Sequence, residues 1–395
     1  MRFFHPTDIL LPNTPHEQWA IIACDQHTSD PAYWEKADAI VGNTASALRL
    51  ILPEVYLSPN NSSRIATINQ TMQRYLRDEL FTEYQDALIY LERTLPSGKI
   101  RRGIVGAVDL DAYDFQKGAD SPIRATEETV ADRLPPRVAI RRNACLELPH
   151  VMLLINDSEK TVIEPLANAK KDFPVLYDFD LMLGGGHVTG YLVTKESAKA
   201  IDCALDALYQ NSPLLFAVGD GNHSLATAKT CFEEKPSPLS RSALVEVVNI
   251  HDPALEFEPI YRVMFGVEPA SFLQELKEYF SKKTANDKQK VIAVFGEQEE
   301  VIEIPALTTL ALSTLQQFLD DYLKNHPNAT LDYIHGREET RSLAKRQNTV
   351  GFLYDGMKKE ELFPAVEKDG ALVRKTFSMG EAAEKRYYIE ARKIQ

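Results

Sequence analysis

The stretch LLFAVGDGNHSLATAK, residues 214–229, places an acid, an amide, an imidazole and a hydroxyl between an apolar run and a helical pattern. A strand that ends in Asp-Gly and enters a helix leaves N–H groups of the first helical turn without partners. These amides and the helix dipole favour an anion, above all phosphate. Asp220 could hold Mg²⁺ or accept a proton, and His223 could bond a phosphoryl oxygen. In the alternative interpretation, Asp220 caps the helix and His223 packs in the core.

A second segment, IRATEETVADRLPPRVAIRR at residues 123–142, carries a high density of charge. Helical charges at this density are typical of a solvated face with i,i+4 pairs. The functional alternative is a guanidinium fork for phosphate with an acid beside it. Its candidate residues are Arg124, Glu127, Glu128, Asp132, Arg133, Arg137, Arg141 and Arg142.

Three weaker motifs stay open between ligand binding and structure. CDQHTSDP (24–31) follows an apolar run, and its side chains could bond a polar ligand or form a capped turn. GGGHVTG (184–190) lacks the spacing of a phosphate-binding P-loop. In the stretch from 373 to 393, Arg374 and Lys375 fit a solvated basic edge.

Composition excludes several classes of protein. The net charge of −13 over 395 residues argues against a general nucleic-acid or anionic-membrane surface. The four cysteines form no CxxC pair, which predicts reduced, mostly buried thiols rather than a disulfide framework or a zinc site. The proline-interrupted start has no apolar signal core, and no window has the length of a membrane span, so we expect a cytoplasmic protein. The sequence leaves the oligomeric state open.

Strand-like and helical patterns alternate along the chain and predict a mixed α/β fold with antiparallel hairpins. Strands are expected at 19–25, 87–95, 101–110, 150–157, 190–194, 243–252, 290–295, 300–304 and 349–355. Helices are expected at 33–41, 63–80, 195–210, 269–281 and 312–325, and in 127–144, where Pro135 and Pro136 interrupt the pattern. A composition shift at 283–290 predicts a main domain over 1–282 and a smaller α/β domain over 283–395 that contributes to the site. We find no P-loop, HExxH, GxSxG, kinase or dinucleotide motif.

Taken together, these segments resemble one bacterial and archaeal family, domain of unknown function 1015. VGDGNHSLATAK and ALVEVVNIHDPALEFEPIYRV resemble its DGHHR segment and the segment that follows it. ALRLILPE, RRGIVGAV, RATEETVADRLPPR and RKTFSMGEAAEKRYY resemble its other blocks. The resemblance runs from about residue 15 to the C-terminus.

The resemblance implies a ParB/sulfiredoxin-like core with a phosphate-binding turn. It also implies a small-molecule kinase that uses Mg²⁺ and, because no adenine-pocket signature is present, pyrophosphate rather than a nucleotide, with the hydroxyl of free L-serine or a similar metabolite as acceptor. Asp220, His223 and Glu127 are then the catalytic candidates, with Asp220 also a metal ligand. The candidates for binding phosphate or substrate are Gly221, Asn222, Ser224, Arg49, Arg124, Thr129, Arg133, Arg262 and Lys375.

The sequence departs from the family pattern at the turn itself. Asn222 stands in place of the first His of DGHHR and Ser224 in place of its Arg, which removes one charged phosphate ligand. Tyr261 stands where the family often has His, and 126–129 read TEET instead of His-Glu-Arg-Thr. Two other functions therefore remain possible: a ParB-like nucleotide-binding regulator, against which the acidic charge speaks, and a phosphate-ester hydrolase with water as acceptor.

Overall fold

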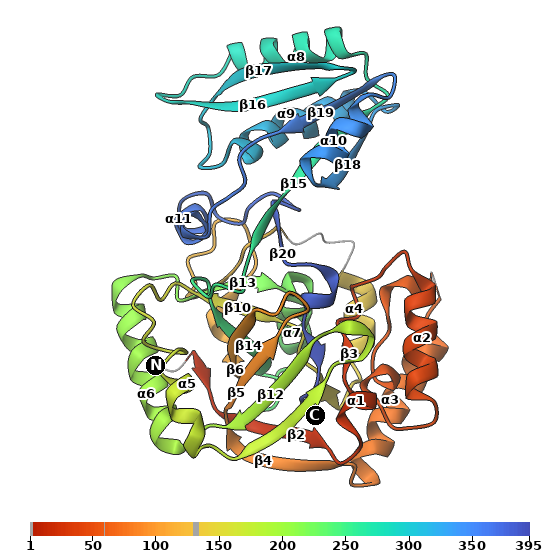
Figure 1. The fold of residues 1–395 in the computed structure, drawn as a ribbon, viewed down its shortest axis with the longest axis vertical. Coiled ribbons are helices and arrows are strands. Elements are labelled where there is room, and N and C mark those ends of the chain that lie inside the picture. Colours follow the sequence, from red (N-terminus) through yellow and green to blue (C-terminus); the bar gives the residue numbers. More distant parts are fainter. Residues whose placement is uncertain (1–2, 59, 129–133) are drawn as a thin grey trace. The chain divides into compact units, whose positions relative to one another are not determined.

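A computed structural model describes residues 3–58, 60–128 and 134–395, and the chain divides into two compact units (Figure 1). Unit 1 is Met1–Leu255 with Gly380–Gln395, and unit 2 is Glu256–Met379. The units therefore separate at 255/256 and 379/380, not at the predicted 282/283. Strand pairing explains the difference, because the strand at Phe257–Phe265 pairs only with later strands, while the end of the chain pairs with strands of unit 1.

Unit 1 is built on a ten-stranded mixed sheet. Its order is β11 (Val175–Asp180), β12 (His187–Leu192), β5 (Ile89–Thr94), β6 (Ile100–Asp109), β14 (Ser242–Asn249), β10 (Met152–Ile155), β13 (Phe216–Asp220), β8 (Ile123–Ala125) and β7 (Tyr113–Asp114), with β1 (Phe4–His5) beside β6. β5 and β6 form the predicted antiparallel hairpin, whereas β10 runs parallel to β14 and β13 parallel to β8. The predicted mixed α/β fold is confirmed.

Helices and short strand pairs complete unit 1. The helices are α1 (His16–Trp19), α2 (Pro31–Val41), α3 (Ser62–Arg77), α4 (Leu134–Arg141), α5 (Leu166–Ala169), α6 (Lys195–Asn211) and α7 (Asn222–Glu234). The short pairs join β2 (Thr7–Pro12) with β4 (Phe81–Ala87), β3 (Ile21–Ile22) with β21 (Tyr387–Tyr388), and β9 (Leu146–Glu147) with β22 (Arg392–Lys393). The strand expected at 19–25 is thus only two residues long. Pro135 and Pro136 lie in the first turn of α4, where a missing N–H costs nothing, and do not interrupt it.

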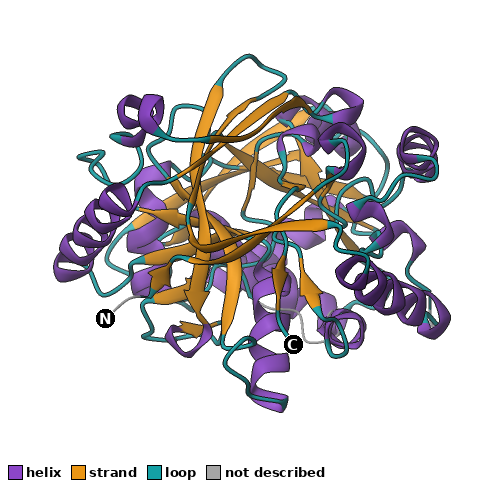
Figure 2. Ribbon diagram, turned by 90° about the horizontal axis from the view of Figure 1, so that it is seen from below, coloured by secondary structure: helices purple, strands orange, loops and turns teal. Residues whose placement is uncertain are grey.

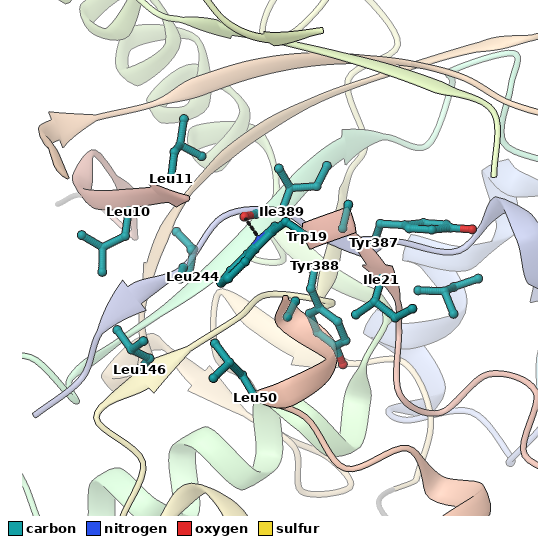
Figure 3. Close-up of a cluster of buried hydrophobic side chains, with 14 of the residues drawn as sticks. Leu10, Leu11, Trp19, Ile21, Leu50, Leu146, Leu244, Tyr387, Tyr388 and Ile389 are labelled. Carbon is teal, nitrogen blue, oxygen red and sulfur yellow. Dashed lines mark hydrogen bonds between the residues drawn. The ribbon is translucent and has the colours of Figure 1, made fainter. Parts of the chain in front are cut away.

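Alternation along β5 places apolar side chains on both faces of the sheet. Ile89 and Leu91 join a cluster with residues of α2 and α3, whereas Tyr90 joins a cluster with residues of α6 and α7. Helices accordingly lie on both sides of the strands (Figure 2). In the first cluster, the fully buried Trp19 donates through Nε1 to the carbonyl of Ile389 at 2.8 Å (Figure 3). Burial of this cluster therefore holds the end of the chain inside unit 1.

Unit 2 has a smaller sheet with helices of its own. The strand order is β17 (Gln298–Pro305), β16 (Lys288–Phe295), β19 (Thr349–Leu353), β15 (Phe257–Phe265) and β18 (Thr330–His335), and β20 (Phe377–Met379) also pairs with β15. Its helices are α8 (Pro269–Ser281), α9 (Ala311–Asn325), α10 (Arg337–Ala344) and α11 (Lys359–Asp369). The predicted helices and strands of this region are confirmed, while β15, β18, α10 and α11 were not predicted. No helix in the described part of either unit has the length and apolarity needed to cross a membrane.

Candidate active site

The turn between β13 and α7 has the strand–turn–helix form that the sequence predicts. β13 ends at Asp220, and Gly221 adopts φ 81° and ψ 27°, a left-handed conformation that glycine tolerates best. A Cβ at this position would lie 3.0 Å from the Cα of Val151, so space as well as conformation selects glycine. Asp220 does not cap α7 in the usual way, since its Oδ1 accepts from the N–H of Gly221 at 2.9 Å. Within the described residues no side chain caps the start of α7.

Asn222 connects this turn to the end of β8. Its Oδ1 accepts from the backbone N–H of Thr126 at 3.1 Å, and its Nδ2 donates to the Thr126 hydroxyl at 3.3 Å. That hydroxyl in turn donates to the carbonyl of Val218 at 2.6 Å. Both side chains are buried. The Asn222 side chain therefore fixes the backbone directly before Glu127, while the predicted contact of its own N–H with phosphate stays a prediction.

Asp220 has a cationic partner that the sequence did not indicate. The Nζ of Lys385 lies 3.2 Å from Asp220 Oδ2, and the two side chains are 15% and 20% exposed. At this partial burial the pair is screened less than a surface ion pair. A carboxylate and an ammonium group thus lie together beside the start of α7.

A second carboxylate, Asp25, lies near the same lysine. Burial opposes its ionisation, but the charges of His150, Lys385 and Arg137 and a hydrogen bond from Gln26 outweigh burial and lower its pKa below the ordinary 3.8. Gln26 donates to Asp25 Oδ1 at 3.0 Å. Asp25 is therefore ionised at neutral pH, and Lys385 interacts with two carboxylates.

The chain brings these groups together by laying its two ends side by side. Tyr387 pairs with Ile22 in the β3–β21 ladder, and the N–H of Ala23 donates to the carbonyl of Arg386 at 2.9 Å. This pairing brings the residues that follow β3 close to those that precede β21. Asp25 and Lys385 consequently approach one another across a separation of 360 positions in the sequence.

Buried arginines hold the segment that carries Lys385 through hydrogen bonds to its backbone carbonyls. Arg93 donates to the carbonyls of Gly185 at 2.9 Å, Ala383 at 2.5 Å and Glu384 at 3.3 Å, and also to that of Lys385. Burial, with the neighbouring charge of Arg101, lowers the pKa of Arg93 to about 9. Arg101 adds a bond to the carbonyl of Glu384 at 2.8 Å.

The next residue, Arg386, anchors the segment from its other side. It is buried, ion-paired with Glu246, and bonded to Glu390 at 2.6 Å and to the carbonyl of Pro149 at 3.1 Å. These contacts fix the backbone on either side of Lys385 and so determine where its ammonium group lies.

The remaining sequence candidates in unit 1 have varied surroundings. Arg124 is buried on β8, where it donates to the carbonyl of Ser121 at 2.8 Å and pairs with Asp120 at 3.0 Å. Arg49 pairs with Asp38 and donates to the carbonyl of Gly42 at 2.8 Å. Glu127, His223 and Ser224 are half-buried. Thr129, Asp132 and Arg133 lie outside the described residues.

Two candidates belong to unit 2. Arg262 is fully buried and donates to Gln316 at 2.8 Å and to the carbonyls of Ile260 at 2.7 Å, Lys375 at 2.9 Å and Arg374 at 2.8 Å. These bonds give Arg262 a structural role inside unit 2 instead of the predicted role as a phosphate ligand. Lys375 is exposed and has a left-handed φ of 57°, and its predicted contact with the phosphate donor stays a prediction.

Sequence reasoning missed Lys385 as the partner of Asp220, and it missed the interaction of Asp25 with Lys385 and His150. Asp25 stands in CDQHTSDP, which was singled out without a partner, and Lys385 stands in a quoted family block. His150 directly precedes an apolar run and carried no signal of its own. Only the pairing of distant segments brings the three together.

The cysteines differ in part from expectation. All four are free thiols, but Cys203 is exposed and the other three are half-buried, so the prediction of mostly buried thiols is wrong. Burial and the charge of Asp25 raise the pKa of Cys24 to about 11, which keeps it a neutral thiol. In the described part of the chain, no three His, Cys, Asp or Glu side chains form a group that could hold a metal ion.

The chain belongs to the family described as "Protein of unknown function (DUF1015)", whose model matches residues 5–322. No curated protein matches it significantly in sequence. Among solved structures it is similar to a free serine kinase variant in complex with ADP, with 12% identity, 75% of this chain and 93% of that chain covered, and a TM-score of 0.43. It is also similar to a conserved hypothetical protein from Pyrococcus furiosus, with 11% identity, coverage of 73% and 94%, and a TM-score of 0.39.

Proposed function

We propose that this member of the DUF1015 family transfers a phosphoryl group from pyrophosphate to the hydroxyl of free L-serine or a similar small metabolite. The observation that carries the proposal is the Asp220–Lys385 pair beside the start of α7. Phosphoryl transfer needs positive charge around the transferred group and a base for the acceptor proton. The ammonium group of Lys385 and the first amides of α7 provide the former, and Asp220 provides the latter.

In the proposed reaction the acceptor oxygen forms a bond to phosphorus while the bridging P–O bond of pyrophosphate breaks. The hydroxyl proton passes to the Asp220 carboxylate, and orthophosphate leaves. Asp25, which also interacts with Lys385, stays ionised. Glu127 orients the acceptor or its amine from the backbone that Asn222 fixes.

The residues fit Mg²⁺ that arrives with the donor better than a resident metal. Mg²⁺ typically uses one or two carboxylates together with substrate phosphates and water, and Asp220 would be its protein ligand. When bound, the ion would offset the charge of the phosphate oxygens. Arg49 and Arg133 remain proposed as further positive charge around the donor.

The test is to incubate the protein with L-serine and Mg²⁺ and, separately, pyrophosphate, ADP or ATP, and to measure O-phosphoserine by mass spectrometry and free phosphate in parallel. We expect phosphoserine with pyrophosphate. Phosphate release that does not depend on serine, with no phosphoserine, would indicate the hydrolase instead. Nucleotide binding with no turnover of any donor would indicate the regulator.

Lys385→Met tests the pair directly, and Lys324→Met is its matched control. Lys324 pairs with Asp321 at 2.8 Å on the surface of unit 2, where the side chains are 72% and 50% exposed. We expect loss of turnover with a weaker KM for pyrophosphate in the first variant and unchanged kinetics in the second. Equal kinetics in both variants would contradict the proposed site.

A further inference from the structure

His150 and Tyr388 form a hydrogen-bonded pair beside the turn between β13 and α7, and neither residue has a role in the reaction proposed above. The Tyr388 hydroxyl lies 2.9 Å from His150 Nδ1, and the rings meet at 87° with centroids 5.6 Å apart. Tyr388 is 2% exposed and its ring lies in the apolar cluster around Trp19 (Figure 3). The tyrosine is therefore a fixed partner for the histidine.

The direction of this hydrogen bond follows from the other partner of the tyrosine. The backbone N–H of Cys24 donates to the Tyr388 oxygen at 3.1 Å, which leaves the phenol hydrogen for a different acceptor. Burial raises the pKa of Tyr388 well above its ordinary value, so the phenol keeps that hydrogen. The neighbouring Cys24 is a neutral thiol and a weak acceptor, whereas an imidazole nitrogen is a good one. The phenol accordingly donates to Nδ1 of His150, and a neutral ring then carries its own hydrogen on Nε2.

One edge of the His150 ring lies against Gly221. The His150 Cδ2, which is bonded to Nε2, lies 3.4 Å from the position that a Cβ on Gly221 would occupy. Gly221 immediately precedes the first amides of α7. His150 also interacts electrostatically with Asp25, which places the ring in the same group of residues as Lys385.

We propose that the Nε2–H of His150 donates a hydrogen bond to the phosphate bound at this turn, and that Tyr388 is a positioning residue that fixes the tautomer required. The inference rests on the proposed function for the identity of the ligand. It assigns a hydrogen-bond donor to His150, beside the ammonium group of Lys385. It also supplies a hydrogen-bond donor to phosphate in a chain whose turn has Asn222 and Ser224 in place of the His and Arg of the family motif.

The binding test uses pyrophosphate and inorganic phosphate with Mg²⁺ at pH 8, where an imidazole is ordinarily neutral. His150→Phe keeps a ring but has no donor, His150→Gln can place an amide N–H near the position of Nε2, and His150→Asn places one near Nδ1. We expect Kd for pyrophosphate to rise about tenfold or more in His150→Phe and to be largely restored in His150→Gln. His187→Gln, at an exposed histidine on β12, should leave Kd unchanged.

A second measurement reads the tautomer without any ligand. Nitrogen-15 NMR of the ring should show His150 with its hydrogen on Nε2, and Tyr388→Phe should give a mixture of the two tautomers. A hydrogen on Nδ1 in the wild type, rescue by Asn rather than Gln, or an unchanged Kd in His150→Phe would overturn the inference. Phosphate binding with the expected variant pattern but no phosphoserine would refute the proposed kinase and leave this donor role standing.

Discussion

Replacing Arg93 with Met should remove the hydrogen bonds that hold residues 383–385 in place. The Arg93 guanidinium bonds four backbone carbonyls of residues 185 and 383–385, and its Cζ lies 4.9 Å from the centre of the Tyr387 ring. Methionine fills much of the side-chain volume but donates nothing. The carbonyls would then lie buried without their donor, which costs more than the bonds contribute net.

The size of the effect can be worked out from these contacts. At about 1 to 1.5 kcal/mol for each of three well-formed bonds, the free energy of unfolding of unit 1 should fall by roughly 3 to 5 kcal/mol. At about 2 to 4 °C for each kcal/mol, Tm should fall by roughly 10 °C. Because Lys385 then loses its fixed position, turnover should also fall, by about tenfold or more at temperatures where the variant is folded.

The assay is thermal unfolding followed by circular dichroism, with serine phosphorylation measured well below Tm. Arg102→Met is the matched control. Arg102 lies on β6, the strand next to that of Arg93, but its side chain is 30% exposed, and its Nε lies 3.6 Å from Glu92 Oε1. Its Tm should change by no more than about 2 °C. If Arg93→Met were as stable as wild type, or no less stable than Arg102→Met, the role of Arg93 in holding residues 383–385 would be refuted.

Three further outcomes are expected. Asp220→Asn should fold normally, but its rate of phosphoryl transfer should fall by about a hundredfold or more, because the amide cannot accept the hydroxyl proton. The surface variant Asp321→Asn should keep the wild-type rate. Near-normal turnover of Asp220→Asn would remove Asp220 from the mechanism. Burial opposes ionisation of Glu147, but the charges of Arg392 and Arg141 outweigh burial and lower its pKa below the ordinary 4.5. The ionised carboxylate therefore stabilises the fold above that pH, and this stabilisation is lost as the pH falls. Acid unfolding followed by circular dichroism should depend less steeply on pH in Glu147→Gln than in the wild type, and equal steepness would contradict this origin. Activity should survive reducing agent and removal of zinc, since no cysteine has a catalytic task in the proposed mechanism, and activity that depends on stoichiometric zinc would overturn that expectation.

Local pattern was sufficient for most of the elements and for the turn. Apolar periodicity located the β5–β6 hairpin, α2, α3, α6, α8 and α9, because burial of one face imposes the period of each element on its own residues. The sequence Asp-Gly between an apolar run and a helical pattern likewise located Gly221, since few other conformations suit that junction. The alternation of elements along the chain also determined the mixed α/β class.

Charge in the sequence was a poor guide to the role of each residue. Arg93 and Arg101 lie directly opposite one another on neighbouring strands, an arrangement of like charges that is unfavourable by itself. The carboxylate of Glu246 and the backbone carbonyls of residues 383–385 offset this repulsion, and these groups come from distant parts of the chain. Arg262 was predicted as a phosphate ligand because it lies in a family block, but the carbonyls of unit 2 occupy its guanidinium.

The sequence by itself determined where the strand–turn–helix junction forms, whereas the tertiary structure decided which side chains lie beside it. Lys385 meets Asp220 only because the end of the chain returns to unit 1, where β21 pairs with β3 and Trp19 bonds Ile389. His150 lies beside the turn because β10 pairs with β13. Hydrophobic burial of Tyr387 and Tyr388 drives that return, and burial is non-directional. A non-directional force does not encode its partner in the local sequence, so residues some 360 positions apart reveal their contact only in the folded chain.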